Sequence, residues 1–101
     1  MPAAAFFAEL EAQVIPEKIA GIDHSYLFDV TDEGKWLVEV RNSTVSVSDG
    51  EGRDADVTIE VSSAVFDKIA SGQQNPATAY MTGKVKIHGD IAAAMKLQKL
   101  F

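Results

Sequence analysis

Residues 75–100, which read NPATAYMTGKVKIHGDIAAAMKLQKL, organise the rest of the chain. Pro76 suits the first turn of a helix, where its missing N–H costs little, and Gly83 suits the left-handed residue that ends one. Residues 84–88 then alternate between polar and apolar side chains, which is the period of a half-buried strand. Asp90 is a suitable N-cap for a last helix. The stretch therefore predicts a short helix, a one-sided strand and a closing helix.

The middle of the chain carries the alternation of a β-sheet. Apolar side chains recur at every second position in four further segments, residues 26–30, 36–40, 45–47 and 57–61. This period is typical of strands that bury one face. Together with the strand at 84–88, these segments predict a sheet of about five strands.

Two short loops are predicted to join the first three strands. A three-residue loop at residues 32–34 pairs Val30 with Trp36 and keeps the apolar side chains on one face, whereas a two-residue loop would mix the faces. Gly34 fits the left-handed position that such a loop needs. Residues 42–43 are predicted as a two-residue loop, because Asn tolerates the positive φ that this turn requires.

Helices are predicted before and after the strand segments along the chain. Residues 3–14 place apolar side chains on one face and only glutamates as charged residues on the other, which disfavours direct binding to anionic lipid. A short helical turn follows at residues 16–20, and Ser62 or its neighbour can cap a helix that ends before Gly72. The residues thus predict one α+β domain, residues 1–101, in which helices cover one face of the sheet.

The net charge of −6 argues against a nucleic-acid binder, which needs a basic face for the phosphates. The charge is uneven along the chain. Residues 1–83 hold 14 acidic and 5 basic residues, a net −9, whereas residues 84–101 hold four lysines against Asp90 alone, a net +3. Two interpretations of this basic segment stay open: its lysines lie on ordinary solvated faces, or they form a landing site for an anionic headgroup or an acidic partner.

The chain contains no cysteine, which excludes disulfides, thiolate metal sites and cysteine nucleophiles. The longest uninterrupted apolar run is residues 3–8, which is too short to span a bilayer. No basic segment precedes this run as it would in a signal peptide. We therefore expect a cytoplasmic protein with no stable membrane insertion.

Recognisable catalytic and metal-binding patterns are missing from the sequence. His24 and His88 have no metal-ligand spacing, and no serine lies in a GxSxG nucleophile context. Asp29 is flanked by apolar residues, but its position in the strand puts it on the polar face. We predict no metal, no cofactor and no enzymatic activity.

The last helix has one polar residue on its apolar side. At about 100° per residue, Ile91, Ala94, Leu97 and Phe101 share one side of the helix, and Gln98 falls among them. A buried amide must be hydrogen-bonded. Its partner is either a neighbouring backbone group or the polar end of an apolar ligand.

Four segments of the C-terminal third form a recognisable pattern, namely residues 75–76, 79–81, 83–89 and 93–98. In these segments, and in the strand at 55–59 with the helix after it, the chain resembles the sterol carrier protein 2 family. The resemblance covers essentially the whole chain. It implies a five-stranded, largely antiparallel sheet with helices on one face. It also implies a hydrophobic tunnel that binds sterols, fatty acids, fatty acyl-CoA or other lipids, in a carrier that does not catalyse a reaction.

A set of side chains on the predicted apolar faces is expected to contact the lipid. Met81 and Met95 are flexible and suit an adaptable apolar wall. The expected lipid-binding residues are Phe6, Leu10, Phe28, Trp36, Val38, Phe66, Ile69, Tyr80, Met81, Ile91, Met95, Gln98 and Phe101.

The chain departs from the family at its C-terminal end. It finishes Lys99-Leu100-Phe101, whereas peroxisomal members end in a tripeptide like Ser-Lys-Leu, so import by that signal is not expected. Longer members also continue with a segment that helps to close the cavity. We expect a more open tunnel, or a homodimer through the C-terminal helix that covers Leu97 and its apolar neighbours.

Two other classes of function remain after this comparison. The main alternative is a protein-interaction or accessory module of a larger lipid- or quinone-metabolising assembly. A small α+β enzyme with an apolar pocket, like a steroid isomerase, fits less well. The chain ends in a helix, and its pattern predicts no buried acidic residue.

Overall fold

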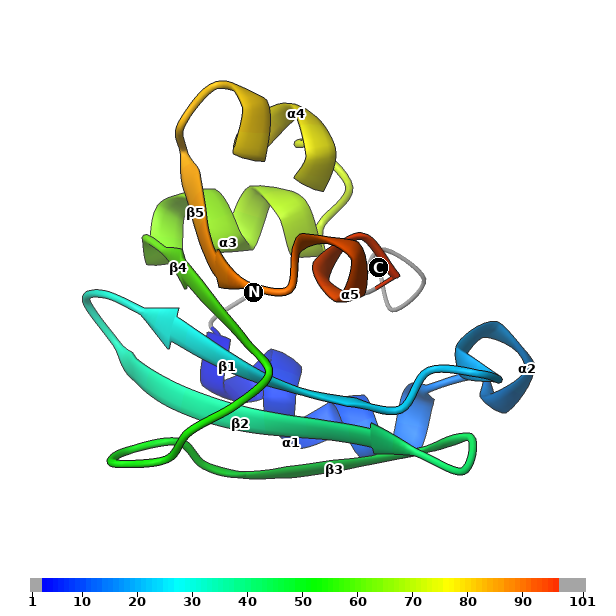
Figure 1. Ribbon diagram of the computed structural model, residues 1–101. Helices are drawn as coiled ribbons and strands as arrows, with labels where there is room; N and C mark the ends of the chain where they lie inside the picture. Colours follow the sequence, from blue (N-terminus) through cyan, green and yellow to red (C-terminus); the bar gives the residue numbers. More distant parts are fainter. Residues whose placement is uncertain (1–2, 97–101) are drawn as a thin grey trace.

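A computed structural model describes residues 3–96 of the protein. Its helices and strands follow the order predicted from the sequence (Figure 1). In chain order they are α1 (Ala3–Gln13), α2 (Pro16–Ile19), β1 (His24–Val30), β2 (Gly34–Arg41), β3 (Thr44–Asp49), β4 (Val57–Val61), α3 (Ser63–Ala70), α4 (Pro76–Met81), β5 (Val85–Gly89) and α5 (Ile91–Lys96).

The five strands form one twisted sheet in the order β3-β2-β1-β4-β5. All neighbours are antiparallel except β1 and β4, which are parallel. This confirms the predicted five-stranded, mostly antiparallel sheet. A parallel pair needs a crossover, and residues 50–56 supply it by passing over the face of the sheet opposite to α1 (Figure 1).

The helices cover one face of the sheet and enclose the core with it. Helix α1 packs against β3 and α3, while α4 and α5 pack against the β4–β5 half. The aromatic ring of Phe7 on α1 stacks on Trp36 of β2, with ring centroids 4.9 Å apart. The buried sheet side chains of this core are Tyr26, Phe28, Val30, Val38, Val40, Val45, Val57, Ile59, Val61 and Val85.

The strand register of the first hairpin differs from the prediction by two residues. Val30 pairs with Gly34, and Phe28 pairs with Trp36, so the loop is residues 31–33. The apolar side chains still share one face, since a shift of two preserves the side on which each residue points. Contacts with distant segments hold this loop: the Thr31 N–H donates to the Val61 carbonyl oxygen at 2.9 Å. Local sequence carries no signal for such a contact.

The second hairpin has the predicted register. Arg41 pairs with Thr44, and Val40 pairs with Val45. The two loop residues, Asn42 and Ser43, have φ values of 53° and 60°. These left-handed conformations form the two-residue turn that matches the twist of a hairpin.

The predicted caps Ser62 and Asp90 are present in the structure, and Asn75 caps a third helix. The Ser62 hydroxyl accepts the Val65 N–H at the start of α3. The Asn75 side chain accepts the N–H groups of the second and third residues of α4, in which Pro76 occupies the first turn. The Asp90 carboxylate accepts the Ala93 N–H at 3.1 Å. Each cap satisfies N–H groups that lack a partner within the helix.

Of the predicted apolar side of α5, Ala94 is buried but Ile91 is not. Ala93 and Ala94 are buried, whereas Ile91 is 39% exposed. Because alanine side chains are small, the helix can approach the sheet closely when Ala93 and Ala94 face it. The larger Ile91 therefore lies away from this contact. The predicted positions Leu97, Gln98, Leu100 and Phe101 lie outside the described residues.

The outer face of the sheet also carries a small apolar contact. Leu27 of β1 pairs with Leu37 of β2. Both occupy strand positions that point to the polar, outer face of the sheet, yet both side chains are buried. The crossover of residues 50–56 begins over them, where the Gly50 N–H donates to the Lys35 carbonyl oxygen at 3.0 Å. A Cβ on Gly50 would lie only 2.5 Å from Leu27 Cδ1. The absence of a side chain at Gly50 therefore permits this close crossing.

Candidate functional site: an apolar cavity between sheet and helices

An apolar cavity of about 60 Å³ lies between the covered face of the sheet and helices α3, α4 and α5. The sheet contributes Phe28, Ile59, Val61, Val85 and Ile87. The helices contribute Phe66, Ile69, Pro76, Ala77, Tyr80, Ala94 and Met95. Among these side chains only that of Tyr80 carries a polar group that forms strong hydrogen bonds. A charged ligand group in this cavity would therefore lose its hydration and gain almost no hydrogen bonds in return.

Sequence periodicity explains how each element reaches this cavity. Ile59 and Val61 alternate along β4 toward the covered face, as Val85 and Ile87 do along β5. Phe66 and Ile69 of α3 are three residues apart and so share one face of the helix. The cavity therefore collects the inward faces of several elements that are separate in the sequence.

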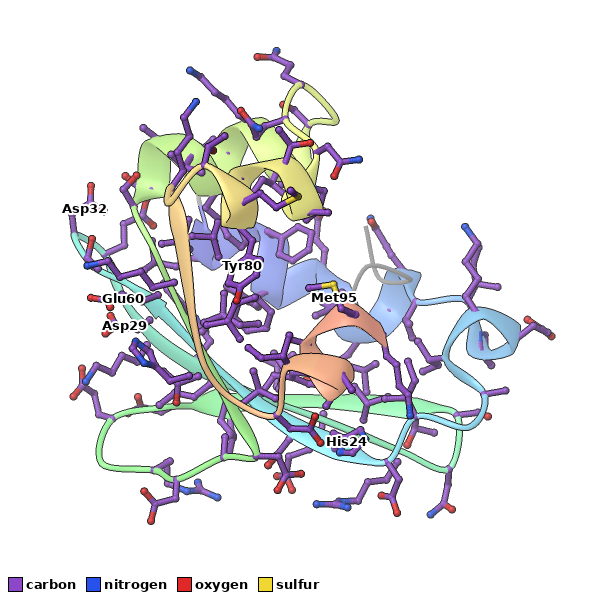
Figure 2. All side chains as sticks on the ribbon, turned by 45° about the horizontal axis from the view of Figure 1, so that its top comes forward. His24, Asp29, Asp32, Glu60, Tyr80 and Met95 are labelled. Carbon is purple, nitrogen blue, oxygen red and sulfur yellow. The ribbon has the colours of Figure 1, made fainter. Side chains whose placement is uncertain are left out.

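Five predicted lipid-binding residues line this cavity. They are Phe28, Phe66, Ile69, Tyr80 and Met95. Figure 2 shows Tyr80 extending from α4 and Met95 extending from α5 toward the same space. Their location agrees with the expected apolar wall, while their contact with lipid stays a prediction.

Four other predicted residues lie in the adjoining core. Phe6 packs edge-on against Phe66, with ring centroids 5.2 Å apart. Trp36 stacks on Phe7. Leu10 and Val38 are buried. These side chains support the cavity wall from behind and do not line it.

Met81 and Ile91 do not lie in the cavity wall. Met81 is 83% exposed and Ile91 is 39% exposed. Met81 ends α4, where the neighbouring Tyr80 takes the inward position instead, and Ile91 begins α5. Gln98 and Phe101, the remaining predicted contacts, lie outside the described residues.

Sequence reasoning missed much of the wall that the strands supply. Ile59, Val61, Val85 and Ile87 all carry the strand alternation that marks the covered face. That alternation was sufficient to predict that these side chains face the helices. It contained no information on where the helices leave a gap, so ordinary core positions and cavity positions looked alike.

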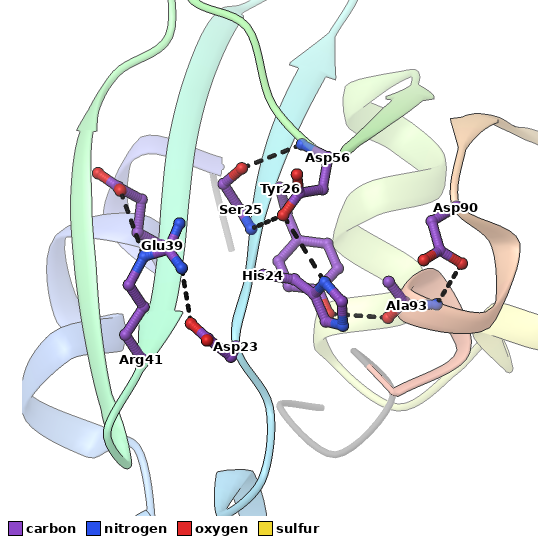
Figure 3. Close-up of polar contacts among 9 residues, drawn as sticks. All are labelled: Asp23, His24, Ser25, Tyr26, Glu39, Arg41, Asp56, Asp90 and Ala93. Atoms are coloured by element: carbon purple, nitrogen blue, oxygen red, sulfur yellow. Dashed lines mark hydrogen bonds and ion pairs between the residues drawn. The ribbon is translucent and has the colours of Figure 1, made fainter.

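A buried tyrosine positions α5 beside the cavity (Figure 3). The Tyr26 side chain is fully buried, and its hydroxyl donates to the Ala93 carbonyl oxygen at 2.7 Å. Burial raises the pKa of Tyr26 to about 12, with smaller contributions from the negative charges of Asp56 and Asp90. The neutral phenol is therefore held as a hydrogen-bond donor to the helix that contributes Ala94 and Met95.

Asp56 joins β1 to the end of the crossover in the same region (Figure 3). Its carboxylate accepts the Ser25 N–H at 3.0 Å, and its own N–H donates to the Ser25 hydroxyl at 3.0 Å. His24 Nδ1 lies 3.6 Å from the same carboxylate. The Asp90 N–H donates to the Asp56 carbonyl oxygen at 3.3 Å. These contacts hold β1, the end of the crossover and the start of α5 together.

A second polar contact ties the first hairpin to α3. Asp32 accepts the Ser63 hydroxyl at 2.6 Å and the Ser63 N–H at 2.9 Å. These hydrogen bonds lower the pKa of Asp32. The loop of the hairpin is thereby fixed to the helix that provides Phe66 and Ile69 to the cavity.

Residues 3–96 contain no cluster of three or more His, Cys, Asp or Glu side chains that could hold a metal ion. His88 Nε2 lies 3.7 Å from Glu60 across the outer face of the sheet. Lys84 and Lys86 line a polar hollow of about 170 Å³ beside Glu60. In the same part of the chain, no helix is long and apolar enough to cross a membrane.

Comparison with known proteins agrees with this architecture. The pattern of the SCP-2 sterol transfer family matches residues 7–101. The human protein named sterol carrier protein 2 is 37% identical over 97 residues, which cover 91% of this chain and 17% of that protein. Hydroxysteroid dehydrogenase-like protein 2 of Xenopus laevis is 34% identical over 97 residues, covering 93% of this chain and 23% of that protein. The chain thus spans less than a quarter of each of these relatives.

Solved structures share the same fold. The sterol carrier protein domain 2 of Helicoverpa armigera superimposes with a TM-score of 0.74 at 27% identity, covering 95% of this chain and 82% of that one. Part of the sec-alkylsulfatase Pisa1 from Pseudomonas sp. superimposes with a TM-score of 0.81 at 26% identity, covering 95% of this chain and 16% of that one. With the family pattern matching nearly its whole length, this chain belongs to the SCP-2 sterol transfer family.

Proposed function

We propose that this protein is a carrier that binds a hydrophobic lipid, such as a sterol, a fatty acid or a fatty acyl-CoA, in the cavity between its sheet and helices. This proposal rests on the composition of the wall: among the lining side chains of residues 3–96, that of Tyr80 alone has a strong hydrogen-bonding group. Burying apolar ligand surface there gains about 0.8 kcal/mol per methylene group. A charged headgroup gains no partner in this wall and stays at the opening.

The proposed ligand must enlarge the cavity when it enters. A volume of about 60 Å³ is smaller than a cavity of roughly 150 Å³ that holds a single benzene ring. Met95 offers a flexible side chain that can move aside. Helix α4 has only six residues, and it is the part of the wall that can move away from the sheet. We therefore propose an expandable site.

Catalysis is not part of this proposal. Among residues 3–96, the side chains that line the cavity include no carboxylate, imidazole or amine that could act as a general acid or base near neutral pH. We propose that the chain acts as one lipid-binding domain without a cofactor. The cytoplasmic location expected from the sequence stays a prediction.

Lipid binding can be tested with purified protein and a fluorescent fatty acid. Native mass spectrometry should detect a co-purified or added lipid, and titration should show saturable binding. Ala77→Phe fills the cavity and should weaken binding at least about ten-fold, since it occupies the space of several methylene groups. Ala64→Phe is the matched control on the exposed side of α3. Absence of lipid and of fatty-acid uptake in the folded wild-type protein would disprove the carrier function.

A second candidate function is an accessory module of a larger lipid- or quinone-metabolising assembly. The observation in its favour is that the chain spans only 17% and 23% of two of its curated relatives. If the chain is such a module, replacing Leu100 and Phe101 with polar residues should abolish its assembly with partners. The homodimer expected from the sequence should be lost as well. Lipid binding by a monomeric carrier should survive the same replacements. Size-exclusion chromatography with light scattering, alongside the fatty-acid titration, separates the two.

A further inference from the structure

The sheet has two edge strands, and they differ in how their edges are protected. Strand β3 lies at one edge and β5 at the other (Figure 1). An edge with unpaired N–H and C=O groups can pair with another extended chain unless something covers it. Helix α1 packs against β3, and its Glu11 carboxylate accepts the Val47 N–H at 3.0 Å. Within residues 3–96, no side chain donates to or accepts from the edge of β5 in this way.

The hydrogen bonds of β4 show which backbone groups of β5 are unpaired. The Asp90 N–H donates to the Asp56 carbonyl oxygen at 3.3 Å, so these two residues form a hydrogen-bonded pair of the antiparallel ladder. Such pairs alternate with pairs that exchange no hydrogen bond. Every second residue of β5 therefore bonds to β4, and the residues between them point their N–H and C=O groups away from it. The edge of β5 thus presents the backbone groups of Val85 and Ile87.

The side chains of β5 give the two sides of this edge opposite character. Val85 and Ile87 lie on the covered side, and Ile87 stays partly exposed. Lys84 and Lys86 lie on the outer side and are exposed. Side chains of neighbouring strands share the alternation of the sheet, so directly opposite residues point to the same face. A strand that fits beside β5 therefore carries apolar residues at every second position and polar residues between them.

The charge on the outer side decides which polar residues fit. Lys84 and Lys86 line the hollow of about 170 Å³ together with Thr31 and Glu60. The Glu60 carboxylate lies 3.7 Å from His88 Nε2. No ion pair of either lysine is found in the described part of the chain. Both lysines are therefore available to carboxylates that an added strand brings to this face.

The rest of the surface directs an acidic segment to this edge. Residues 1–83 carry 14 acidic and 5 basic residues, so most of the protein repels negative charge. At the other edge of the sheet, Asp49 ends β3 and Glu11 occupies the Val47 N–H. A second copy of this chain fits β5 less well than an acidic segment does. Two β5 edges paired with each other would bring the lysines of both copies onto one face, which is unfavourable.

We propose that the edge of β5 binds an extended segment of a partner protein, with alternating acidic and apolar residues, as an added strand of the sheet. The backbone groups of Val85 and Ile87 pair with the segment, and Lys84 and Lys86 pair with its carboxylates. Its apolar side chains lie beside Ile87. In this mode of recognition the main-chain hydrogen bonds give affinity and the alternate side chains give specificity. Strand addition does not use the interior of the cavity, so it holds whether or not the chain carries lipid.

Binding of designed peptides to the intact protein tests this proposal. The probe is a labelled peptide of about six residues, the usual length of a strand, in which glutamate and valine alternate. Fluorescence anisotropy should show saturable binding, and its absence would overturn the proposal. A peptide that alternates lysine and valine should bind at least about ten-fold more weakly. A peptide that alternates glutamate and glycine has the same charge but low strand propensity, and equal binding of this peptide would overturn strand addition.

Backbone methylation of the peptide separates strand addition from simple charge attraction. N-methyl groups on alternate residues remove the N–H groups along one side of an extended chain and leave its charge unchanged. Methylation of the side that faces β5 should weaken binding at least about ten-fold, because those hydrogen bonds are lost. A loss on methylating the valines indicates an antiparallel addition, and a loss on methylating the glutamates indicates a parallel one. Unchanged binding of both methylated peptides would overturn the proposal.

Variants of the protein test the role of the two lysines. Lys84→Gln/Lys86→Gln should lower the affinity for the glutamate–valine peptide on the order of ten-fold. Lys18→Gln/Lys68→Gln is the matched control, since it removes two exposed lysines from α2 and α3. Equal losses in the two variants would overturn the pairing. Fatty-acid titration of the same variants keeps the carrier function apart: a wild-type protein that binds the peptide but no fatty acid overturns the carrier function alone.

Hydrogen exchange of single amides locates the added strand. With the glutamate–valine peptide bound, the amides of Val85 and Ile87 should exchange at least about ten-fold more slowly. The Val45 amide, which points away from β2 as that of Val47 does, is the matched site on the β3 edge and should not change. Protection at β3 in place of β5 would overturn the proposal. So would protection of β5 that needs no peptide and rises with protein concentration, which would assign this edge to a second copy of the chain.

Discussion

The hydroxyl of Tyr26 in the central strand β1 donates a 2.7 Å hydrogen bond to the carbonyl oxygen of Ala93 in α5. The two residues are 67 positions apart in the sequence. The remaining contact of α5 with the core is made largely by two alanines, whose small side chains bury little apolar surface. This one polar contact therefore has a large share in placing Ala94 and Met95 at the cavity.

Removing the hydroxyl of Tyr26 should destabilise the fold. Tyr26→Phe should lower the free energy of unfolding by about 1–2 kcal/mol, because the buried Ala93 carbonyl oxygen loses its side-chain partner. Urea denaturation followed by circular dichroism measures this change. Tyr80→Phe is the control, since no hydrogen bond of its hydroxyl is found within residues 3–96. Equal losses in the two variants would contradict a special role for Tyr26.

The same tyrosine should make stability depend on alkaline pH. Its pKa is about 12 in the folded protein and about 10.0 in an unfolded chain. Below pH 10 the phenol is neutral in both states and the stability is complete. As the pH rises from 10 toward 12, ionisation favours the unfolded chain and the free energy of unfolding falls.

Comparison with Tyr26→Phe isolates this alkaline effect. The variant has no phenol at position 26, so its stability should fall less steeply over the same pH interval. Urea midpoints measured at increasing pH give the two slopes. Parallel slopes for wild type and variant would show that Tyr26 does not titrate with a raised pKa.

Asp32 should contribute a pH dependence at the acid end. Its folded-state pKa lies below the ordinary value of 3.8, because the carboxylate accepts two hydrogen bonds from Ser63. The stabilisation is therefore complete above pH 3.8 and is lost as the pH falls through the lower folded-state pKa. The melting temperature of Asp32→Asn should lie below that of wild type at neutral pH, and the gap should narrow in acid.

An exposed aspartate supplies the control for this acid effect. Asp54→Asn changes the same charge in the crossover loop, where no hydrogen bond of the Asp54 carboxylate is found within the described part of the chain. Its melting temperature should follow that of wild type at every pH. If Asp32→Asn also does so, the hydrogen bonds to Ser63 do not stabilise the fold.

The crossover at Gly50 should not tolerate a side chain. A Cβ there would lie 2.5 Å from Leu27 Cδ1 and 3.0 Å from backbone carbons of Lys35 and Trp36. Gly50→Ala should therefore destabilise the protein by about 1–3 kcal/mol through overpacking. Glu51→Ala, next to it and exposed, should change stability little. Chemical denaturation that finds no difference between the two would contradict the close crossing.

Much of the architecture could be predicted because its determinants are local. Strand alternation identified the covered face of the sheet, and Ser62, Pro76 and Asp90 indicated the starts of three helices. The second hairpin was predicted in register because residues 42–43 alone determine its turn. Such patterns depend on neighbours in the sequence, so a single sequence contains them.

The candidate site could be predicted only in part. Phe28, Phe66, Ile69, Tyr80 and Met95 were expected at the cavity because they are large and lie on apolar faces. Size and face do not distinguish a cavity wall from a filled core, and Trp36 and Val38 were expected at the site for the same reasons. The outward position of Met81 also follows from how α4 packs on β5, which periodicity does not determine.

By itself, the sequence determined the order of the elements, the covered face of each strand, the helix caps and the family resemblance, because backbone geometry and side-chain period are encoded within a few residues. Tertiary structure alone decided the register of the first hairpin, where Thr31 and Asp32 contact β4 and α3. It also decided the burial of Leu27 beneath the crossover and the cavity between α4, α5 and the sheet. These features depend on which distant surfaces meet and how completely they fill the space between them, and no local pattern specifies that.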